Sequence, residues 1–485
     1  MGARTRIFLA STLYGAATLA AAVDGGHFPA PYGSAGDGAG GDSARGERSS
    51  GERAGGERAG GERRLLVVSN NAANPETTPA PDAMPGFAAL RGRFDRVLSW
   101  NDAIRPFHPG GWSPRADDVP MWERYLRLLW GLDAPGDGTD VELVVESLQV
   151  EPALALARMF PEAPIDVYAD GLMSYGPTRN KLDPLVGSRV RRLLHPELLP
   201  GLDPLLLTEF GVPGEIVSSS AVRGVLAELS AHAPASVAGA PSGAALLLGQ
   251  YLSALDILTA DEEERLHLRM LRGAAELGHR SVVFKPHPVA PARYAGALEK
   301  EAGELGVELR VLTEPVLAEV LYERLRPALV VGCFSTALLT ASAYYGLPVA
   351  RTGTELLLER VTPYQNSNRV PVTIVDALLP DVSDPAAVRT WSPPDRERVR
   401  AELAGLLRAV GFCMQPQILP GLRPEAEAYL TRHFDGRTRR YFKRRRLTAL
   451  GLPGAVPRQL AFVPRNRTVR RVARRARALK RAALG

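Results

Sequence analysis

The sequence predicts an α/β protein made of two doubly wound, Rossmann-like domains that face each other. Short runs of β-branched and aliphatic residues alternate with helical patterns in both halves of the 485-residue chain, as in parallel sheets covered by helices. Several runs stop abruptly at residues suited to bind an anion, as strands do at the carboxyl edge of such a sheet. Residues 234–244, rich in Ala, Ser, Gly and Pro, predict the interdomain linker.

This pattern divides the chain into four parts. The first domain spans residues 1–233 and the second spans residues 245–436, on either side of the linker. Residues 437–485 form a tail with 17 Lys and Arg and no acid. The rest of the chain has 42 basic against 53 acidic side chains, so it is acidic although the whole carries a net charge of +6.

The N-terminal stretch predicts a first strand, loop and helix. Arg6–Ala10 suits a strand, Ser11–Gly15 is a polar loop, and Ala16–Val23 suits a helix. Arg4 and Arg6 ahead of an apolar run also resemble the start of a signal peptide, which is the alternative interpretation. The apolar run is too short to span a bilayer.

Residues 31–64 predict a disordered surface insertion. Gly-Glu-Arg recurs at positions 46, 51, 56 and 61 among glycine, serine and alanine, and such a composition cannot form a core. Residues 193–207 contain three prolines and are expected to close the regular pattern of this domain. Elsewhere in the first domain we expect strands at Leu65–Ser69, Phe94–Ser99, Val141–Val145 and Ile165–Gly171, helices at Met121–Leu132 and Pro152–Phe160, and a last strand and helix within Ile216–Ala233.

The second domain repeats the alternation of strands and helices, and residues 395–433 predict further helices that brace the two domains. We expect its strands at Ala245–Gly249, Ser281–Lys285, Glu308–Leu312, Ala328–Gly332 and Pro348–Ala350, and its helices at Asp261–Leu277, Pro291–Leu305, Val316–Leu325 and Ala337–Tyr345.

Cysteine content and tail composition bear on location. Cys333 and Cys413 are the only cysteines, which excludes a disulfide framework and a cysteine-based zinc site and suits a reducing cytoplasm.

The tail predicts a basic amphipathic helix, because its apolar residues recur at helical spacing. These residues are Val469, Val472, Ala476, Leu479 and Ala483. We expect the tail to bind an anionic membrane surface, at about 1 kcal/mol per basic residue, which would make the protein peripheral at the inner face of the plasma membrane. A solvated tail, or one that binds nucleic acid, is the alternative.

Two predicted strand ends of the second domain carry candidate site residues. Lys285 ends one strand, and the prolines on either side of His287 stiffen the loop that presents this imidazole. Ser335 and Thr336 stand at the expected N-cap of the next helix, where backbone N–H groups and the helix dipole attract an anion. Each feature alone has an ordinary structural explanation, a stiff loop or a helix cap. Together they predict a phosphate site that faces the imidazole.

Asp170 is the candidate site residue of the first domain. It follows a predicted strand, where a carboxylate faces the ligand edge, and Gly171 after it permits a sharp turn. An Asp-Gly turn with no chemical role is the alternative. The functional interpretation makes Asp170 a general base. Ser174, Tyr175 and Arg179 lie just downstream, where they are candidates to contact an acceptor.

The set of motifs resembles bacterial sialyltransferases, and most closely the α-2,8-polysialyltransferase family, over roughly Arg6 to Pro380. The resemblance is carried in chain order by three motifs, with further likeness in their surroundings. The motifs are Tyr168-Ala-Asp-Gly171, Lys285-Pro-His-Pro288 and Phe334-Ser-Thr336, and the surroundings are Ile7-Phe-Leu-Ala-Ser-Thr12, Asp170-Gly-Leu-Met-Ser-Tyr175 and Leu246-Leu-Leu-Gly-Gln-Tyr-Leu252. The resemblance implies the two-domain GT-B glycosyltransferase architecture, with the acceptor on the first domain and the nucleotide sugar on the second.

The resemblance also implies an activity: transfer of sialic acid, or a related nonulosonic acid, from its CMP-activated form to a glycan hydroxyl with inversion. Asp170 would deprotonate the acceptor, His287 would assist the leaving phosphate, and Ser335 and Thr336 would hold it. Lys285 would add positive charge at the phosphate. We expect no cofactor beyond the CMP-sugar donor and no metal, since the sequence has no Asp-x-Asp pair.

Two residues leave alternatives open. Glu319 stands where such domains often place a carboxylate for the nucleotide ribose, although a solvent-facing helical glutamate explains it equally. Ala169 replaces the first of two acids in the family motif, which raises the question of how Asp170 is tuned. The alternative functions are a transferase for another donor, CMP-Kdo or a UDP-sugar, and a non-catalytic relative that binds a polyanion or a membrane.

Overall fold

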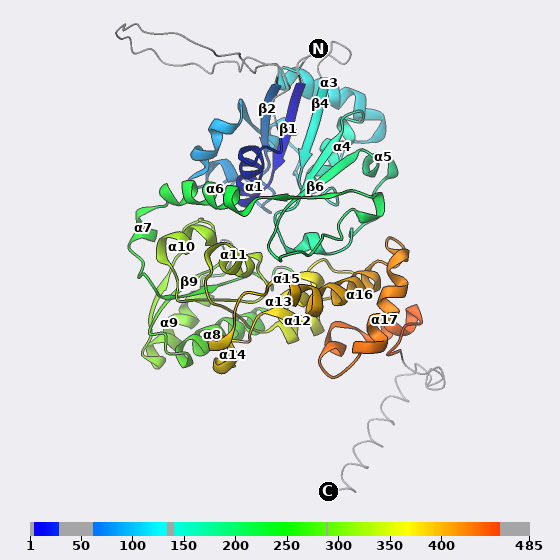
Figure 1. Cartoon of the computed structure of the whole chain (residues 1–485). Coiled ribbons are helices and arrows are strands. Elements are labelled where there is room, and N and C mark those ends of the chain that lie inside the picture. The colour runs from blue at the N-terminus through cyan, green and yellow to red at the C-terminus, as the bar shows by residue number, and fades with distance from the viewer. Residues whose placement is uncertain (1–3, 29–61, 133–139, 288–289, 456–485) are drawn as a thin grey trace, which may run out of the picture.

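The computed structural model describes residues 4–28, 62–132, 140–287 and 290–455. Within them the chain forms two parallel sheets, one in each half, which are stacked in Figure 1 with the first half above the second. The strands of the first sheet are β1 Arg4–Ala10, β2 Glu62–Val68, β3 Arg96–Ser99, β4 Asp140–Val145, β5 Ile165–Tyr168, β6 Val190–Pro196 and β7 Gly214–Val217. Those of the second sheet are β8 Ala245–Leu248, β9 Ser281–Lys285, β10 Glu308–Val311, β11 Leu329–Gly332 and β12 Val349–Arg351.

Both sheets are doubly wound. The strand orders are β3-β2-β1-β4-β5-β6-β7 and β10-β9-β8-β11-β12, with every neighbouring pair parallel. The winding therefore reverses between β1 and β4 in the first sheet and between β8 and β11 in the second, which is where such sheets bind ligands. The central strands are buried on both faces because helices cover both sides. The predicted GT-B architecture is confirmed.

Helices connect the strands in each half. Those of the first half are α1 Leu13–Asp24, α2 Trp100–Ala103, α3 Val119–Trp130, α4 Ala153–Met159, α5 Pro184–Gly187 and α6 Ser219–Ala231. Those that follow are α7 Ala235–Ala238, α8 Ala260–Glu276, α9 Arg293–Leu305, α10 Ala318–Leu325, α11 Thr336–Tyr345, α12 Thr354–Arg360, α13 Arg369–Leu378, α14 Pro385–Thr390, α15 Arg396–Val399, α16 Gly405–Met414, α17 Arg423–His433 and α18 Arg444–Leu450.

The N-terminal stretch forms the first strand and helix of the fold, as expected. The side chain of Thr12 accepts a hydrogen bond from the N–H of Gly15 and caps α1. The guanidinium of Arg6 is buried and bonds to Glu62 and Glu142 on the two neighbouring strands. A charged residue of the supposed signal peptide is thus an internal ion-pair partner.

Three boundaries differ from those predicted. β2 begins at Glu62, inside the predicted insertion, while residues 31–61 lie outside the described part of the chain. The prolines of residues 193–207 conceal β6, which runs to Pro196. The predicted linker, residues 234–244, contains the short helix α7.

Residues 437–455 belong to the second domain, although the sequence assigned them to the tail. Tyr441 and Leu447 are buried, and the hydroxyl of Tyr441 donates to Asp376 of α13 at 2.8 Å. Arg446 donates to the carbonyls of Cys413 and Met414 in α16. The domain therefore extends at least to Ala455. The predicted amphipathic helix of the tail lies outside the described residues.

The two domains are in direct contact. Arg324 of α10 donates two hydrogen bonds to the carbonyl of Ser230 in α6. A Cβ on Gly176 of the first domain would stand 3.2 Å from Val370 of α13. These contacts flank the carboxyl edges of both sheets, which face each other.

Candidate active site

Asp170 lies where the first domain meets the second. It follows β5 by two residues, at the carboxyl edge of the first sheet, and is partly buried. Burial raises its pKa, and a hydrogen bond from its own main chain acts in the opposite direction. Since a carboxylate with a raised pKa binds a proton more strongly than an exposed aspartate, Asp170 is suited to act as a base.

Gly171 and Thr336 join the two domains beside Asp170. The N–H of Leu172 donates to Oγ1 of Thr336 at 3.3 Å, and a Cβ on Gly171 would stand 2.9 Å from the same oxygen. The φ of Gly171 is −148°, an extended conformation open to any residue. The glycine is therefore required for close approach of the second domain, and not for the sharp turn that the sequence suggested.

Ser335 and Thr336 stand at the start of α11, as predicted. The hydroxyl of Ser335 caps the helix by accepting from the N–H of Ala337 at 3.2 Å, and Thr336 is the first helical residue. Both side chains are partly exposed. The N–H of Ala337 bonds to the Ser335 hydroxyl and that of Leu338 to the Ser335 carbonyl, and the positive end of the helix dipole can attract an anion here.

Lys285 and His287 occupy the neighbouring strand end. Burial lowers the pKa of Lys285, while Glu319 and Glu314 oppose the shift. His287 is exposed, and the centroid of its ring lies 6.3 Å from that of Tyr251. Desolvation of part of the ring, and then the charge of Lys285, lower the pKa of His287. This shift favours the neutral imidazole, which carries one N–H donor.

Glu319 is buried, so the solvent-facing alternative is wrong. Its Oε1 accepts from the hydroxyl of Thr340 at 2.6 Å. Burial raises the pKa of Glu319, the hydrogen bond from Thr340 and the charge of Lys285 lower it, and the charge of Asp170 raises it further. Asp170 and Lys285 come from different domains, so both strand ends share one electrostatic environment.

The three predicted acceptor residues are placed differently from one another. Ser174 is buried, and its hydroxyl donates to the carbonyl of Gly171 at 2.9 Å. Tyr175 is buried in a hydrophobic cluster that contains residues of both domains. Arg179 is exposed, and its main chain bonds to Gln149 and Gln415. Ser174 thus supports the Asp170 loop in this structure, and contact with an acceptor stays a prediction for all three.

Two polar residues at the same edges escaped the sequence analysis. Oε1 of Gln250, after β8, accepts from the N–H of Phe334, after β11, at 2.9 Å and ties the two switch-point loops together. Glu146 directly follows β4, and its Oε2 accepts from the hydroxyl of Ser11 at 2.6 Å. Burial raises the pKa of Glu146 to about 7. The sequence signal for Glu146 was an acid close after a buried strand, as it was for Asp170.

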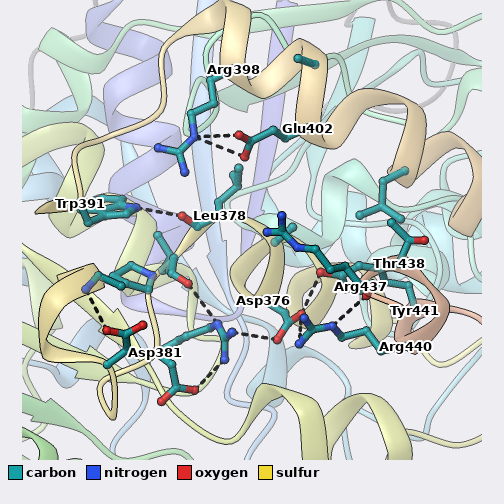
Figure 2. A pocket seen from close by; sticks show the side chains of 18 of the residues that line it. Asp376, Leu378, Asp381, Trp391, Arg398, Glu402, Arg437, Thr438, Arg440 and Tyr441 are labelled. Atoms are coloured by element: carbon teal, nitrogen blue, oxygen red, sulfur yellow. Dashed lines mark hydrogen bonds and ion pairs between the residues drawn. The ribbon is translucent and has the colours of Figure 1, made fainter. Parts of the chain in front are cut away.

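A separate cavity of about 740 Å³ lies in the second domain (Figure 2). Asp376 in its wall accepts from Thr354 and Tyr441 and pairs with Arg351 and Arg440. Trp391 donates from its ring to the carbonyl of Leu378. None of the predicted site residues lines this cavity. Another pair in its lining is Arg398 with Glu402, and we assign the cavity no part in the site.

Among the described residues, no three His, Cys, Asp or Glu side chains gather in a way that could hold a metal ion. Of the helices that the structure describes, none combines the length and the apolar character needed to span a bilayer.

Solved glycosyltransferase structures are only distantly similar. The GT-B domain of a sialyltransferase from Photobacterium damselae aligns with a TM-score of 0.37 at 10% identity, over 77% of this chain and 96% of that chain. A UDP-glucosyltransferase from Polygonum tinctorium gives 0.40 at 12% identity, over 88% and 99%. MurG from Acinetobacter baumannii gives 0.38 at 8%, over 80% and 88%. Scores this low transfer no residue or substrate to this chain.

A family comparison is more informative. No curated protein matches the chain. The family model for alpha-2,8-polysialyltransferase matches residues 56–354, a narrower span than the one suggested by the motifs but one that includes Asp170, His287 and Thr336. Because more than half of its length matches this model, the chain belongs to the alpha-2,8-polysialyltransferase family and is a sialyltransferase-like glycosyltransferase.

Proposed function

We propose that the protein transfers sialic acid, or a related nonulosonic acid, from its CMP-activated form to a glycan hydroxyl, with inversion and without a metal ion. One observation carries the proposal. The Asp170 loop of the first domain meets the start of α11 in the second, where Leu172 donates to Thr336. A base for the acceptor and an anion site for the donor thus lie on opposite sides of one domain boundary.

On the acceptor side, Asp170 acts as the general base. Its carboxylate takes the proton of the acceptor hydroxyl while that oxygen bonds to the anomeric carbon of the donor sugar. The bond from this carbon to the phosphate oxygen breaks, and its electron pair leaves with CMP. Attack from the face opposite the phosphate inverts the configuration. The raised pKa of Asp170, caused by burial, favours the proton transfer.

On the donor side, the phosphate of the departing CMP gains negative charge. The hydroxyls of Ser335 and Thr336 and the first N–H groups of α11 donate to it. Lys285 supplies a positive charge, and the N–H of His287 donates a hydrogen bond. A bound phosphate raises the pKa of the imidazole, so His287 then protonates the leaving oxygen. Glu319 accepts from the ribose hydroxyls. Protein donors offset the phosphate charge without a metal.

Substitution of the two reacting groups tests the proposal. We expect Asp170→Asn and His287→Ala each to slow CMP release from CMP-sialic acid in the presence of a glycan acceptor, with a loss of about 10²-fold to 10⁴-fold for Asp170→Asn. CMP-Kdo and UDP-sugars serve as alternative donors, and mass spectrometry of an acceptor panel identifies the product. Turnover with one of those donors alone would reassign the donor. No turnover with any donor would favour a binding role.

We further propose that the tail places the enzyme on an anionic membrane surface at the cytoplasmic side of the plasma membrane. Residues 456–485 contain 10 Lys and Arg and no acid, and each basic residue near such a surface contributes about 1 kcal/mol. Removal of residues 456–485 tests this proposal and spares residues 437–455, which pack in the second domain. We expect the truncated protein to lose sedimentation with phosphatidylserine vesicles and to keep turnover on a soluble acceptor. Sedimentation unchanged by truncation would contradict the proposal.

A further inference from the structure

Glu146 and Asp170 are brought to the same edge of the first sheet by adjacent strands. Glu146 directly follows β4 and Asp170 follows β5 by two residues, and these strands pair in parallel with Val145 opposite Val167. On its other side β4 pairs with β1, after which Ser11 donates to Oε2 of Glu146 at 2.6 Å. Glu146 is thus held beside the site at the point where the winding of the sheet reverses.

We propose that Glu146 is the second carboxylate of the acceptor side, a positioning residue that acts through Asp170 and replaces the acid missing at Ala169. This inference rests on the proposed function, because it requires Asp170 to be the base. Glu146 lies just after β4, four positions beyond Glu142, and belongs to none of the motifs found in the sequence.

The groups around the two carboxylates leave them uncompensated. Among the described residues, neither Glu146 nor Asp170 forms an ion pair with Arg, Lys or His. The titratable groups on which the charges of Glu146 and Asp170 act, or which share that environment, come from β5, α1, α10, α11 and the end of β9. They are Tyr168, Tyr14, Glu319, Tyr344, Tyr345 and Lys285. The single cation in this set, Lys285, acts on Glu319.

Charge on Glu146 therefore makes Asp170 a stronger base. Burial raises the pKa of Glu146 to about 7, the hydrogen bond from Ser11 lowers it, and the charge of Asp170 raises it. Two carboxylates that sense each other lose their protons in two steps that belong to the pair. The upper step, near pH 7, completes the ionisation of the pair. Above it the anionic Glu146 favours transfer of the acceptor proton to Asp170.

The test is the pH dependence of kcat/KM for the glycan acceptor with CMP-sialic acid. Glu146→Gln keeps the size of the side chain and an acceptor for Ser11, but removes the charge. We expect the acid limb to move down by about one pH unit and the maximal rate to fall about tenfold. Glu162→Gln, an exposed carboxylate just before β5, is the matched control and should follow the wild type.

Two further variants separate tuning from a merely structural effect. Glu146→Asp keeps the charge and should keep the upper inflection. Ser11→Ala removes the hydrogen bond that lowers the pKa of Glu146, so the inflection should move to higher pH, opposite to the shift in Glu146→Gln. If Glu146→Gln does not fold, these two variants carry the test, and an unchanged inflection in Ser11→Ala overturns the inference.

Asp170→Asn separates a failure of the proposed function from a failure of the proposed role of Glu146. If Asp170→Asn is inactive while Glu146→Gln has the wild-type pH profile, the role of Glu146 is refuted and the proposed function stands. If Asp170→Asn retains full activity, the proposed base is wrong and the role of Glu146 falls with it.

Discussion

The two ends of strands β4 and β5 carry the same chemistry in opposite settings. Each strand has an acid at its amino side and another four residues later, beyond its carboxyl end. At the amino side, Glu142 accepts from Arg6 at 2.8 Å and from Arg191 at 3.2 Å. Asp166 accepts from Arg191 and Arg192, both at 2.9 Å. At the carboxyl side, Glu146 and Asp170 have no such partners among the described residues.

The difference in partners reverses the effect of burial. Burial alone would raise the pKa of Glu142, but hydrogen bonds from Arg191 and Arg6 outweigh it and hold the pKa below its usual value. Burial of Glu146 is not offset in this way, and its pKa is raised to about 7. A paired carboxylate adds stability near neutral pH, and an unpaired one reduces it and gains basicity. One end of these strands therefore stabilises the fold, and the other carries the carboxylates that we propose for the reaction.

Removal of a paired acid should have the largest effect on stability. Glu142→Gln removes one of the two carboxylates that pair with the buried Arg6 and one of the two that pair with Arg191, so we expect the free energy of unfolding to fall by about 3 kcal/mol. Urea unfolding at pH 7 measures the change, with Glu162→Gln as the control. If the variant is as stable as the wild type, the paired acids at the amino side of β4 and β5 do not differ in effect from the unpaired acids at the carboxyl side.

Removal of an unpaired acid should have the opposite sign. The folded state binds the proton of Glu146 more tightly than the unfolded state, so wild-type stability falls as pH rises from the usual glutamate pKa through about 7. Glu146→Gln has no ionisable group at this position, so its stability does not fall in this way as the pH rises. We expect it to be more stable than the wild type by about 2 kcal/mol at pH 8, with no difference near pH 4. Thermal unfolding across this range tests the sign, and a destabilised variant at pH 8 would contradict it.

Gly171→Ala should give the smallest effect, on activity alone. A Cβ at position 171 would stand 2.9 Å from the hydroxyl oxygen of Thr336 and hinder approach of the domains. We expect turnover to fall about tenfold, which corresponds to about 1.4 kcal/mol, with nearly unchanged unfolding. Gly224→Ala in α6, whose Cβ would meet no atom within 4 Å, is the control. A loss of stability in Gly171→Ala that exceeds its loss of turnover would mean that this contact serves the fold.

The sequence predicted what depends on local pattern. Apolar runs that end at Lys285 and just before Asp170 marked strands and their ligand edge correctly. β6 was missed because Arg191 and Arg192 break its apolar run and Pro196 ends it. Those charges are accommodated by Asp166, Glu142 and Glu215 on other strands of the sheet.

Features that depend on distant contacts were not predictable. A single acid after a strand, such as Glu146, looks like any loop residue until β1 and β5 are placed beside it. Residues 437–455 have the composition of a tail, yet Arg446 and Lys443 donate to backbone carbonyls of the second domain. Composition does not reveal whether a basic side chain faces inward.

The hydroxyl of Thr336 has a consequence for how the two halves communicate. A hydroxyl accepts through its lone pairs and donates through one hydrogen. In this structure its oxygen accepts from Leu172, and among the described residues its hydrogen meets no protein acceptor. A phosphate that takes this hydrogen polarises the oxygen and strengthens the bond to Leu172. In the proposed mechanism the arrival of the donor would thereby be relayed through one atom to the Asp170 loop, and serine at this position would keep the relay while valine would remove it.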